Sequence, residues 1–269
     1  MSVLVIGGTG TTGSRLARML PDAVAGTRTP RHPGQVRFDW DDPATFDGAL
    51  DGVHGVYLIP PVGVVDPVPV VESFLARARL VRRVVLLSSS AVPESATEMG
   101  ALPSLVRTMP EWAVLRPSWF MQNFTGDHQV AQGVRAGEIV SATGDGRVAF
   151  IDAGDIAAVA ARALTDPVPH NTDHLITGPE ALSYADAAAI ITEITGRVVR
   201  HRSIGTAELA ERFAKTVPRE FATLLAGLDE AISHGAEDRV TTTVEDVTGR
   251  PARSFRAFYS ELLSRTPAG

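Results

Sequence analysis

The first half of the chain alternates short runs of apolar and β-branched residues with segments of helical periodicity. The runs predicted to be strands are residues 3–6, 24–26, 36–38, 56–59, 84–87 and 113–115. Helices are predicted over residues 12–20 and from Asp66 to about Val81, where Asp66 is a good N-cap and Pro67 suits the first turn. Apolar strands separated by helices are typical of a parallel sheet with helices on both faces. The pattern therefore predicts an α/β fold built around one such sheet.

The pattern changes after Pro117 and becomes mainly helical. Asp155 and Ser183 are predicted to cap helices, and Gly196 is predicted to end one. Pro218 is predicted to separate two helices, and residues 144–146 to form a glycine-rich turn. The helices predicted in this half are residues 119–135, 156–162, 184–195, 206–215, 219–233 and 253–264. No repeat of fixed period is present, so one fold has to account for the whole chain.

Length and composition narrow the class of protein. A chain of 269 residues fits one α/β domain with a small additional lobe, and two independent domains would be tight. The net charge of −6 argues against nucleic acid as the main ligand, and no apolar run reaches the roughly 18 residues of a membrane span. The lack of cysteine and of a leader-like start fits a reducing cytoplasm. We expect a cytoplasmic protein, monomeric or homodimeric, whose partner is a small molecule rather than a membrane.

The strongest chemical signal is the run Gly7-Gly8-Thr9-Gly10-Thr11-Thr12-Gly13, between the first predicted strand and the first predicted helix. Glycines at such a turn let the backbone approach a pyrophosphate, and the helix that follows offers unpaired N–H groups and the positive end of its dipole. Gly7 is assigned to the turn, Gly10 to the close approach and Gly13 to helix packing. The alternative is a tight turn without a ligand, and the strand-to-helix context favours dinucleotide binding.

Arg28 indicates which dinucleotide is bound. A site that prefers NAD normally has an acidic residue about 20 residues beyond the motif, at the end of the second strand, to hold the ribose hydroxyls. Here that strand is followed by Thr27-Arg28-Thr29, with Arg31 and His32 just behind. A guanidinium can pair bidentately with the 2′-phosphate of NADP(H). We therefore predict NADP(H), against the alternative that Arg28 is a solvated loop charge.

Several further segments, taken together with the glycine run, resemble one family. They are residues 27–28, 38–43, 86–90, 115–124, 150–157 and 248–251. On these residues the chain resembles the NmrA-like atypical short-chain dehydrogenases over nearly its whole length. Residues 99–100 and 110–124 most resemble the subgroup that contains fungal ergot-alkaloid iminium reductases and their bacterial relatives.

The resemblance implies a doubly wound parallel Rossmann sheet with a small C-terminal substrate-binding lobe. It implies a single NAD(P)-binding domain over residues 1–269, with its Rossmann core at about 1–150 plus returning segments and the lobe mainly in 151–269. The cofactor residues that the glycine run and the resemblance predict together are Gly7, Thr9, Gly10, Thr11, Thr12, Gly13, Arg28, Asp39, Trp40, Ile59, Pro60, Pro61 and Ser88. Within this set the resemblance implies that Asp39 and Trp40 line the adenine. It also implies that Ile59, Pro60 and Pro61 pass beside the nicotinamide ribose, and that Ser88 and Ser89 lie near the nicotinamide.

The usual catalytic pair of short-chain dehydrogenases is missing from the sequence. That pair is a tyrosine acid and a lysine four residues later, which lowers the pKa of the tyrosine. The tyrosines here are Tyr57, Tyr184 and Tyr259, they are followed at that spacing by Pro61, Ala188 and Leu263, and the only lysine is Lys215. Reduction of a simple ketone builds an alkoxide that needs a proton or a strong donor. This observation argues against ketones as substrates.

An activated electrophile depends less than a ketone on a proton donor from the protein. Hydride neutralises an iminium, and a quinone spreads the new negative charge over its ring. Catalysis would then depend on holding the reactants in near-attack geometry inside a dry pocket. Ser88 or Ser89 is the tentative catalytic group, which would orient the nicotinamide carboxamide or donate a hydrogen bond. The alternative is that both are strand-end hydroxyls satisfied by the backbone.

The segment after the sixth predicted strand supplies candidate substrate residues. It combines apolar and amide side chains at the carboxyl edge of the sheet, where ligands bind in doubly wound folds. The predicted substrate residues are Trp119, Phe120, Gln122, Asn123, Phe124 and, from a later segment, Phe150, beside Ile151. The start of a core helix explains the same cluster almost as well.

Other chemical signals are weak. His170 and His174 have helical spacing for a metal pair, but Pro167 and Pro169 favour a surface loop, and no metal is predicted. Asp155 is better explained as an N-cap than as half of an acid–base pair with Asp152. The sequence thus favours an NADPH-dependent reductase of an imine, iminium or quinone-like molecule. An NADPH-sensing binding protein without turnover, or a redox-neutral enzyme on the same fold, stays open as an alternative.

Overall fold

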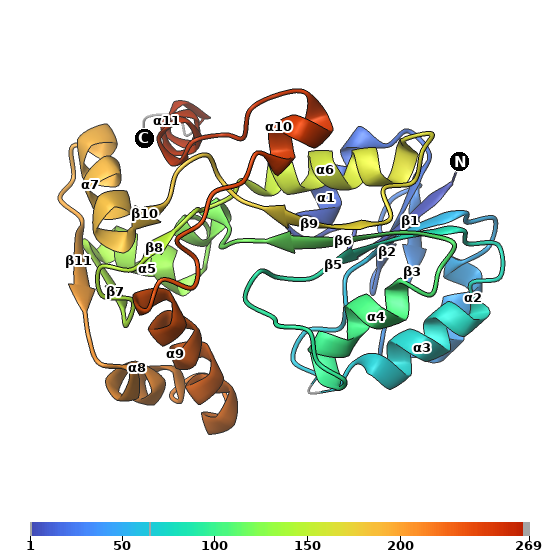
Figure 1. Cartoon of the computed structure of the whole chain (residues 1–269), viewed down its shortest axis with the longest axis horizontal. Helices are drawn as coiled ribbons and strands as arrows, with labels where there is room; N and C mark the ends of the chain where they lie inside the picture. Colours follow the sequence, from blue (N-terminus) through green and yellow to red (C-terminus); the bar gives the residue numbers. More distant parts are fainter. Residues whose placement is uncertain (1, 65, 266–269) are drawn as a thin grey trace. The chain divides into compact units, whose positions relative to one another are not determined.

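The computed structural model describes residues 2–64 and 66–265 (Figure 1). Within it the chain forms two compact units, each made of three segments. Unit 1 comprises Met1–Pro117, Ala153–Ile176 and Thr243–Arg250, and unit 2 comprises Ser118–Asp152, Thr177–Thr242 and Pro251–Gly269. The predicted domain, 1–269, has both ends outside the described residues, and residues 118–150 of its predicted core belong to unit 2.

Unit 1 is built on a seven-stranded sheet in which all neighbouring strands are parallel. Its order is β3-β2-β1-β4-β5-β6-β9. The strands are β1 (Val3–Ile6), β2 (Ala23–Thr27), β3 (Gln35–Arg37), β4 (Gly55–Leu58), β5 (Arg83–Leu87), β6 (Glu111–Pro117) and β9 (Thr172–Ile176). At the centre Val5 of β1 is in register with Ala25 of β2 and Tyr57 of β4. The predicted doubly wound parallel Rossmann sheet is confirmed.

Helices cover both faces of this sheet (Figure 1). One face carries α2 (Phe46–Ala49), α3 (Val68–Arg77) and α4 (Leu102–Val106), and the other carries α1 (Gly13–Met19) and α6 (Ala153–Thr165). The short helix α10 (Thr243–Thr248) contacts α6, and η1 (Pro43–Thr45) and η2 (Glu98–Ala101) precede α2 and α4. Both faces of the sheet are therefore buried, which explains why every residue of the central strands β1 and β4 is buried.

The core on the first face is fixed by aromatic side chains. Phe46 and Phe74, both fully buried, pack against Leu4 and Val56 of the sheet, and their rings meet edge to face at 5.4 Å. Phe38 stacks on Phe46 at 5.4 Å. Because such rings bury a large apolar area, this cluster anchors the strands that carry the glycine run.

Unit 2 has smaller sheets surrounded by helices. A parallel pair joins β7 (Glu138–Ser141) and β11 (Arg200–Ser203), and an antiparallel pair joins β8 (Arg147–Val148) and β10 (Leu182–Ser183). The helical elements are η3 (Met121–Phe124), α5 (Gln129–Ala136), α7 (Tyr184–Thr195), α8 (Thr206–Phe213), α9 (Arg219–Ser233) and α11 (Phe255–Arg265). The core contains the rings of Phe124, Phe150, Tyr184 and Phe255. Unit 2 therefore has an aromatic core of its own.

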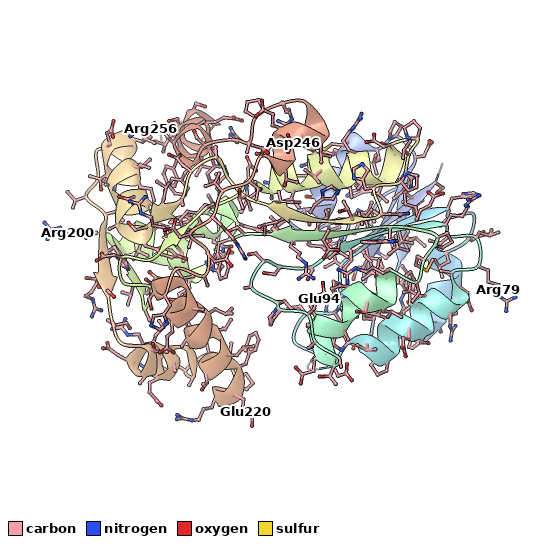
Figure 2. All side chains as sticks on the ribbon, in the orientation of Figure 1. Arg79, Glu94, Arg200, Glu220, Asp246 and Arg256 are labelled. Carbon is pink, nitrogen blue, oxygen red and sulfur yellow. The ribbon has the colours of Figure 1, made fainter. Side chains whose placement is uncertain are left out.

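Charged side chains are spread over the surface of each unit. Arg79, Glu94, Arg200, Glu220, Asp246 and Arg256, labelled in Figure 2, are all exposed and come from different segments of the chain.

The helices with the clearest end signals are predicted best. Ser183 caps α7 with a full capping box, since the Asp186 amide donates to Ser183 Oγ and the Ser183 amide donates to the Asp186 carboxylate, both at 3.0 Å. Gly196 ends α7 in the left-handed region, with φ of 70°. Helix α9 covers the predicted residues 219–233 and follows Pro218. These ends are set by local chemistry, so the sequence alone predicts them.

The predicted helix over residues 119–135 is wrong. The segment forms the short η3 and then α5, with extended backbone at Thr125 and at His128. Gly126 between them adopts a positive φ of 65°, which an α-helix cannot contain. His128 starts α5 by accepting the amide of Val130 at its Nδ1 atom, at 3.2 Å.

Asp155 is not the predicted N-cap. Helix α6 begins at Ala153, so Asp155 lies inside its first turn. Its carboxylate pairs with the guanidinium of Arg250 at 3.2 Å. A carboxylate in the first turn is stabilised by the helix dipole, and the helix starts three residues before the predicted first helical residue, Ile156.

Strand β9 was missed, and the predicted surface loop around His170 and His174 is wrong for His174, which lies in β9. The imidazoles are joined by a hydrogen bond of 2.8 Å between His170 Nδ1 and His174 Nε2. His170 Nε2 in turn lies 3.1 Å from the Asp166 carboxylate. The two histidines thus form part of a polar chain along the edge of the sheet.

The hydrogen-bonded series of Asp166, His170 and His174 makes the stability of the fold sensitive to acid. Burial, with a smaller contribution from His170, lowers the pKa of His174 from the ordinary 6.5 to about 4. Below the ordinary value the unfolded chain therefore binds more protons than the folded chain, so stability falls as the pH drops from 6.5 towards 4. Allowing for solvent screening, we expect a loss of about 1 kcal/mol at acidic pH that His174→Gln removes. Urea unfolding of both proteins under neutral and acidic conditions measures it, and equal losses would contradict the assignment.

Candidate functional site

The glycine run forms a tight turn between β1 and α1. Gly7 has a positive φ of 66°, and the Gly10 amide donates to the Gly7 carbonyl oxygen at 2.8 Å. A Cβ on Gly13 would lie 2.3 Å from that same oxygen, and a Cβ on Gly8 would lie 2.5 Å from the Cβ of Ala25. Side chains at these two positions are excluded by backbone and by a packed strand, so the turn requires glycine.

Tyr57 of β4 stabilises the turn. Its side chain is fully buried, and its hydroxyl donates to Thr12 Oγ1 at 3.2 Å. Burial raises the pKa of Tyr57 far above the ordinary value, so the hydroxyl stays protonated. Thr12 and Gly13 are buried while Thr11 is exposed. Thr12 and Gly13 therefore hold the turn in place rather than lining the space in front of it.

A pocket of about 840 Å³ opens in unit 1 beside this turn. It brings together most of the predicted cofactor residues: Gly7, Thr9, Gly10, Arg28, Asp39, Trp40, Ile59, Pro60 and Pro61. It also includes residues that the sequence did not single out, among them Gly26, Gln35 and Val62. Thr11, Thr12, Gly13 and Ser88 are not among the described residues that line it.

The pocket is lined by charged residues of both signs, since Asp39 and Asp41 line it together with two arginines. The guanidinium groups of Arg28 and Arg31 both line it, and within the described part of the chain neither forms an ion pair. The other end of the pocket is fixed, since the Trp40 indole N–H donates to the Ile59 carbonyl oxygen at 3.1 Å. An anionic ligand would find two available guanidinium groups beside a helix N-terminus.

Ser88 and Ser89 follow the end of β5. The Ser88 amide donates to the Leu115 carbonyl oxygen at 2.8 Å, and Ser89 Oγ accepts the Ala91 amide at 3.2 Å. Both residues are half-buried. The Ser89 hydroxyl is therefore engaged by local backbone, while the Ser88 hydroxyl makes no hydrogen bond within the described residues.

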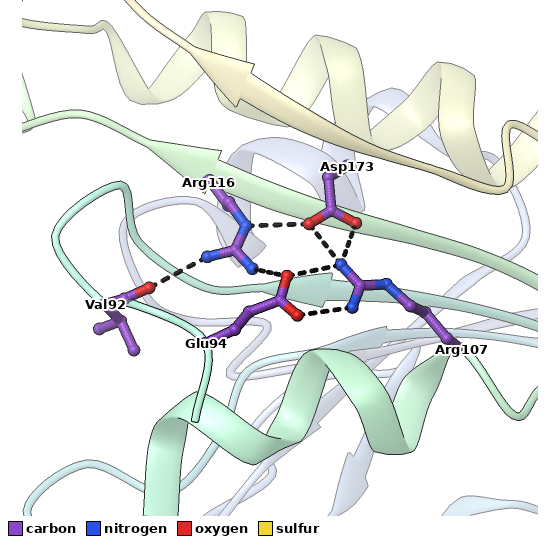
Figure 3. Close-up of polar contacts among 5 residues, drawn as sticks. All are labelled: Val92, Glu94, Arg107, Arg116 and Asp173. Carbon is purple, nitrogen blue, oxygen red and sulfur yellow. Dashed lines mark hydrogen bonds and ion pairs between the residues drawn. The ribbon is translucent and has the colours of Figure 1, made fainter. Parts of the chain in front are cut away.

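An ion network fixes the loop that carries these serines (Figure 3). Glu94 of the loop bonds both nitrogens of Arg107, at 2.8 and 2.7 Å, and one nitrogen of Arg116, at 2.7 Å. Asp173 of β9 bonds the same two arginines at 2.7 and 3.0 Å, and Arg116 also donates to the Val92 carbonyl oxygen at 3.0 Å. The Arg107 guanidinium lowers the pKa of Glu94 to about 2, so the network stays charged at neutral pH. No local sequence pattern indicates this network, because its members come from four separate segments.

Unit 2 contains a second pocket, of about 460 Å³. Two predicted substrate residues, Trp119 and Asn123, line it. Phe124 and Phe150 instead pack in the core, each with 2% of its surface exposed, so they have little surface left for a ligand. The lining residues that sequence reasoning missed include His128, Tyr184 and Asp229.

The remaining predicted substrate residues are tied to the backbone and to acidic side chains of unit 2. Phe120 forms a bridge with Ile151, whose amide donates to the Trp119 carbonyl oxygen at 2.9 Å. The Gln122 amide group donates to Asp152 Oδ1 at 3.0 Å. Asp152 also pairs with Arg253 at 2.9 Å. These contacts shape the segment, and neither Phe120 nor Gln122 is among the described residues lining the second pocket.

The described part of the chain shows neither a metal-binding cluster nor a membrane-spanning helix. Residues 2–64 and 66–265 contain no group of three or more His, Asp or Glu side chains placed to hold a metal ion. Within the same residues no helix has both the length and the apolar character needed to cross a membrane.

The fold and the glycine turn together define the class of protein. A doubly wound parallel sheet whose first strand ends in a glycine turn at a helix N-terminus is the architecture of Rossmann-type dinucleotide-binding proteins. Unit 1 has this sheet, this turn and a pocket beside them.

Comparison with known proteins narrows the class to a family. No family model matches the chain. The chain is 48% identical over 266 residues to an uncharacterized oxidoreductase, YesF, of Bacillus subtilis, covering 95% of this chain and 93% of the relative. It is 38% identical over 282 residues to agroclavine dehydrogenase of Claviceps fusiformis, covering 97% of both. An NADPH-dependent quinone oxidoreductase of Escherichia coli, solved with NADPH, has a TM-score of 0.81 at 22% identity, covering 97% of this chain and 99% of that one.

These relatives show the family. The chain belongs to the NmrA-like atypical short-chain dehydrogenases and, within them, to the group of the ergot-alkaloid clavine dehydrogenases. The predicted family is thereby confirmed, and the structural likeness independently confirms the fold.

Proposed function

We propose that the protein is an NADPH-dependent reductase that transfers hydride to an activated small molecule, either an imine or iminium or a quinone-like compound. The observation that carries the proposal is the pair of available guanidinium groups, Arg28 and Arg31, in a pocket beside the glycine turn. Support also comes from the relatives, which are named as oxidoreductases and dehydrogenases and match over nearly the whole chain.

The residues of the first pocket fit NADPH. The turn has no side chain at Gly7, Gly10 or Gly13, which leaves room for a pyrophosphate against the backbone. Arg28 would pair with the 2′-phosphate, and Asp39 and Trp40 would line the adenine. We assign Ile59, Pro60 and Pro61 to the nicotinamide ribose. The pocket thus offers contacts for the pyrophosphate, the 2′-phosphate, the adenine and the nicotinamide ribose.

NADPH supplies a hydride, which converts an iminium to a neutral amine or, together with a proton from water, a quinone to its hydroquinone. Neither reaction requires an acid as strong as the tyrosine of the usual catalytic pair. Tyr57 is unsuited to that role, because its hydroxyl is buried and bonded to Thr12. We assign to the protein the orientation of the nicotinamide, through Ser88, and the exclusion of water.

The test is to incubate the protein with NADPH and a panel of hydride acceptors, and to measure the consumption of NADPH. We expect NADPH oxidation that depends on added N-methyl-dihydroisoquinolinium or menadione, and slower oxidation of NADH. A reaction without acceptor is the control. Tight NADPH binding with no turnover of either acceptor would instead indicate a sensor, and product formation without NADPH loss would indicate a redox-neutral enzyme. Either result would overturn the proposal.

A further inference from the structure

The loop between β2 and β3, residues 28–34, ends in a tight turn. The Gln35 amide closes this turn by donating to the His32 carbonyl oxygen at 3.2 Å. Gly34 within the turn has a positive φ of 83°, a conformation that favours glycine. Its carbonyl oxygen accepts the Ala25 amide at 2.9 Å, which ties the turn to β2. The end of the loop therefore has a defined conformation against the sheet.

The side chain of Gln35 also holds this loop. Its Oε1 atom accepts the backbone amide of Arg31 at 2.7 Å and that of His32 at 3.3 Å. Because backbone N–H groups only donate, the atom that meets both of them has to be the oxygen of the carboxamide. The carboxamide is therefore bound to the loop through its oxygen, and its nitrogen is left to donate elsewhere.

The Nε2 group of Gln35 is available to a ligand. Among residues 2–64 and 66–265 it has no hydrogen-bond partner. Gln35 is half-buried, and within the same residues no side-chain nitrogen or oxygen of such a residue is both buried and without a partner. The Nε2 atom is therefore accessible. Gln35 lines the first pocket together with Arg28, Arg31 and His32 of the loop.

The position of this donor indicates which part of a dinucleotide it meets. In Rossmann-type sites the loop after the second strand lies beside the 2′ position of the adenine ribose. A 2′-phosphate can only accept hydrogen bonds from the protein, whereas a 2′-hydroxyl is normally held by an acidic acceptor. Residues 28–35 contain no acid, and the acidic lining residues Asp39 and Asp41 follow β3. A carboxamide N–H in this loop therefore suits the phosphate.

We propose that Gln35 is a specificity-determining residue of the cofactor site, whose Oε1 atom holds the loop while its Nε2 group donates to the 2′-phosphate of NADPH. The inference rests on the proposed reductase function, because it concerns the cofactor of that reaction. It adds a neutral donor from β3 to the two arginines of the preceding loop. It also makes Gln35 the positioning residue for Arg31, whose amide Oε1 accepts.

The test is fluorescence titration of two Gln35 variants with NADPH and with NADH. Gln35→Met removes both the acceptor and the donor without adding charge. Gln35→Glu keeps an oxygen that can accept the Arg31 and His32 amides, but it replaces the donor with a second acceptor. We expect the ratio of NADPH to NADH affinity to fall about fivefold or more in Gln35→Met and about tenfold or more in Gln35→Glu. The affinity for NADH should stay within about twofold.

Pro33→Glu is the matched control for the new negative charge. Pro33 lies in the same turn, is exposed and is not among the described residues that line the pocket. Its effect on the affinity ratio measures the influence of a carboxylate acting at a distance. We expect the loss in Gln35→Glu to exceed the loss in Pro33→Glu clearly. Equal losses in these two variants would mean that Gln35 does not donate to the phosphate, and the proposal would be overturned.

The titrations also separate this inference from the reductase proposal. An unchanged affinity ratio in Gln35→Met overturns the role of Gln35, even if NADPH is oxidised by an added acceptor. If the ratio changes as expected but no acceptor oxidises NADPH, the role of Gln35 stands and the reductase proposal fails. Thermal unfolding and the affinity for NADH, which has no 2′-phosphate, show whether each variant is folded.

Discussion

Alanine in place of Gly13 is expected to lower the affinity for NADPH by about ten- to a hundredfold. The new Cβ would lie 2.3 Å from the carbonyl oxygen of Gly7, which belongs to backbone and cannot rotate away. Either the turn or the start of α1 has to move, and both form the proposed pyrophosphate site. Fluorescence titration with NADPH measures the loss.

Gly48→Ala is the control for this substitution. Gly48 lies in α2 of the same unit, and a Cβ there meets no atom within 4 Å. Its NADPH affinity should equal that of the unaltered protein. A folded Gly13→Ala protein that binds NADPH with unaltered affinity would remove the glycine turn from the cofactor site.

The sequence could indicate a candidate cofactor site because most parts of that candidate are local. The turn, the helix that follows it and the loop with Arg28 all lie within one βαβ segment of the chain. In such a unit, the strands are buried on both faces and therefore appear as continuous apolar runs. The turn is recognisable from its closely spaced glycines. The resemblance to a family then supplied Asp39, Trp40 and the Ile59 to Pro61 segment, which composition and periodicity alone do not indicate.

The second pocket could not be predicted, because its polarity arises from tertiary packing. Within α9, Asp229 occupies an ordinary position of an amphipathic helix, where a carboxylate is usually solvated. It becomes a partly buried, unneutralised charge only because the backbone after β7 packs against it. Strand β9 was missed for a related reason. It lies at the edge of the sheet and contains polar residues such as Asp173 and His174, so it lacks the apolar run of a central strand.

Arg28→Ala is expected to weaken NADPH binding by about ten- to a hundredfold and NADH binding by about twofold or less. The reason is that the two cofactors differ in the 2′-phosphate, and a guanidinium bonds such a dianion through charge-assisted hydrogen bonds. Parallel titrations with both cofactors measure the ratio, so any general damage to the pocket cancels. Arg79→Ala removes an exposed arginine of the same unit and should leave both affinities unchanged.

Arg31→Ala tests which of the two arginines binds the 2′-phosphate, because Arg31 lines the same pocket three residues further along the chain. If Arg31→Ala changed the ratio of NADPH to NADH affinity and Arg28→Ala did not, the phosphate would be bound by Arg31 and the assignment of Arg28 would be wrong. If both variants changed the ratio, the two guanidinium groups would share the phosphate. Their joint positive charge then explains why the loop after β2 carries arginines where an NAD site would carry an acid.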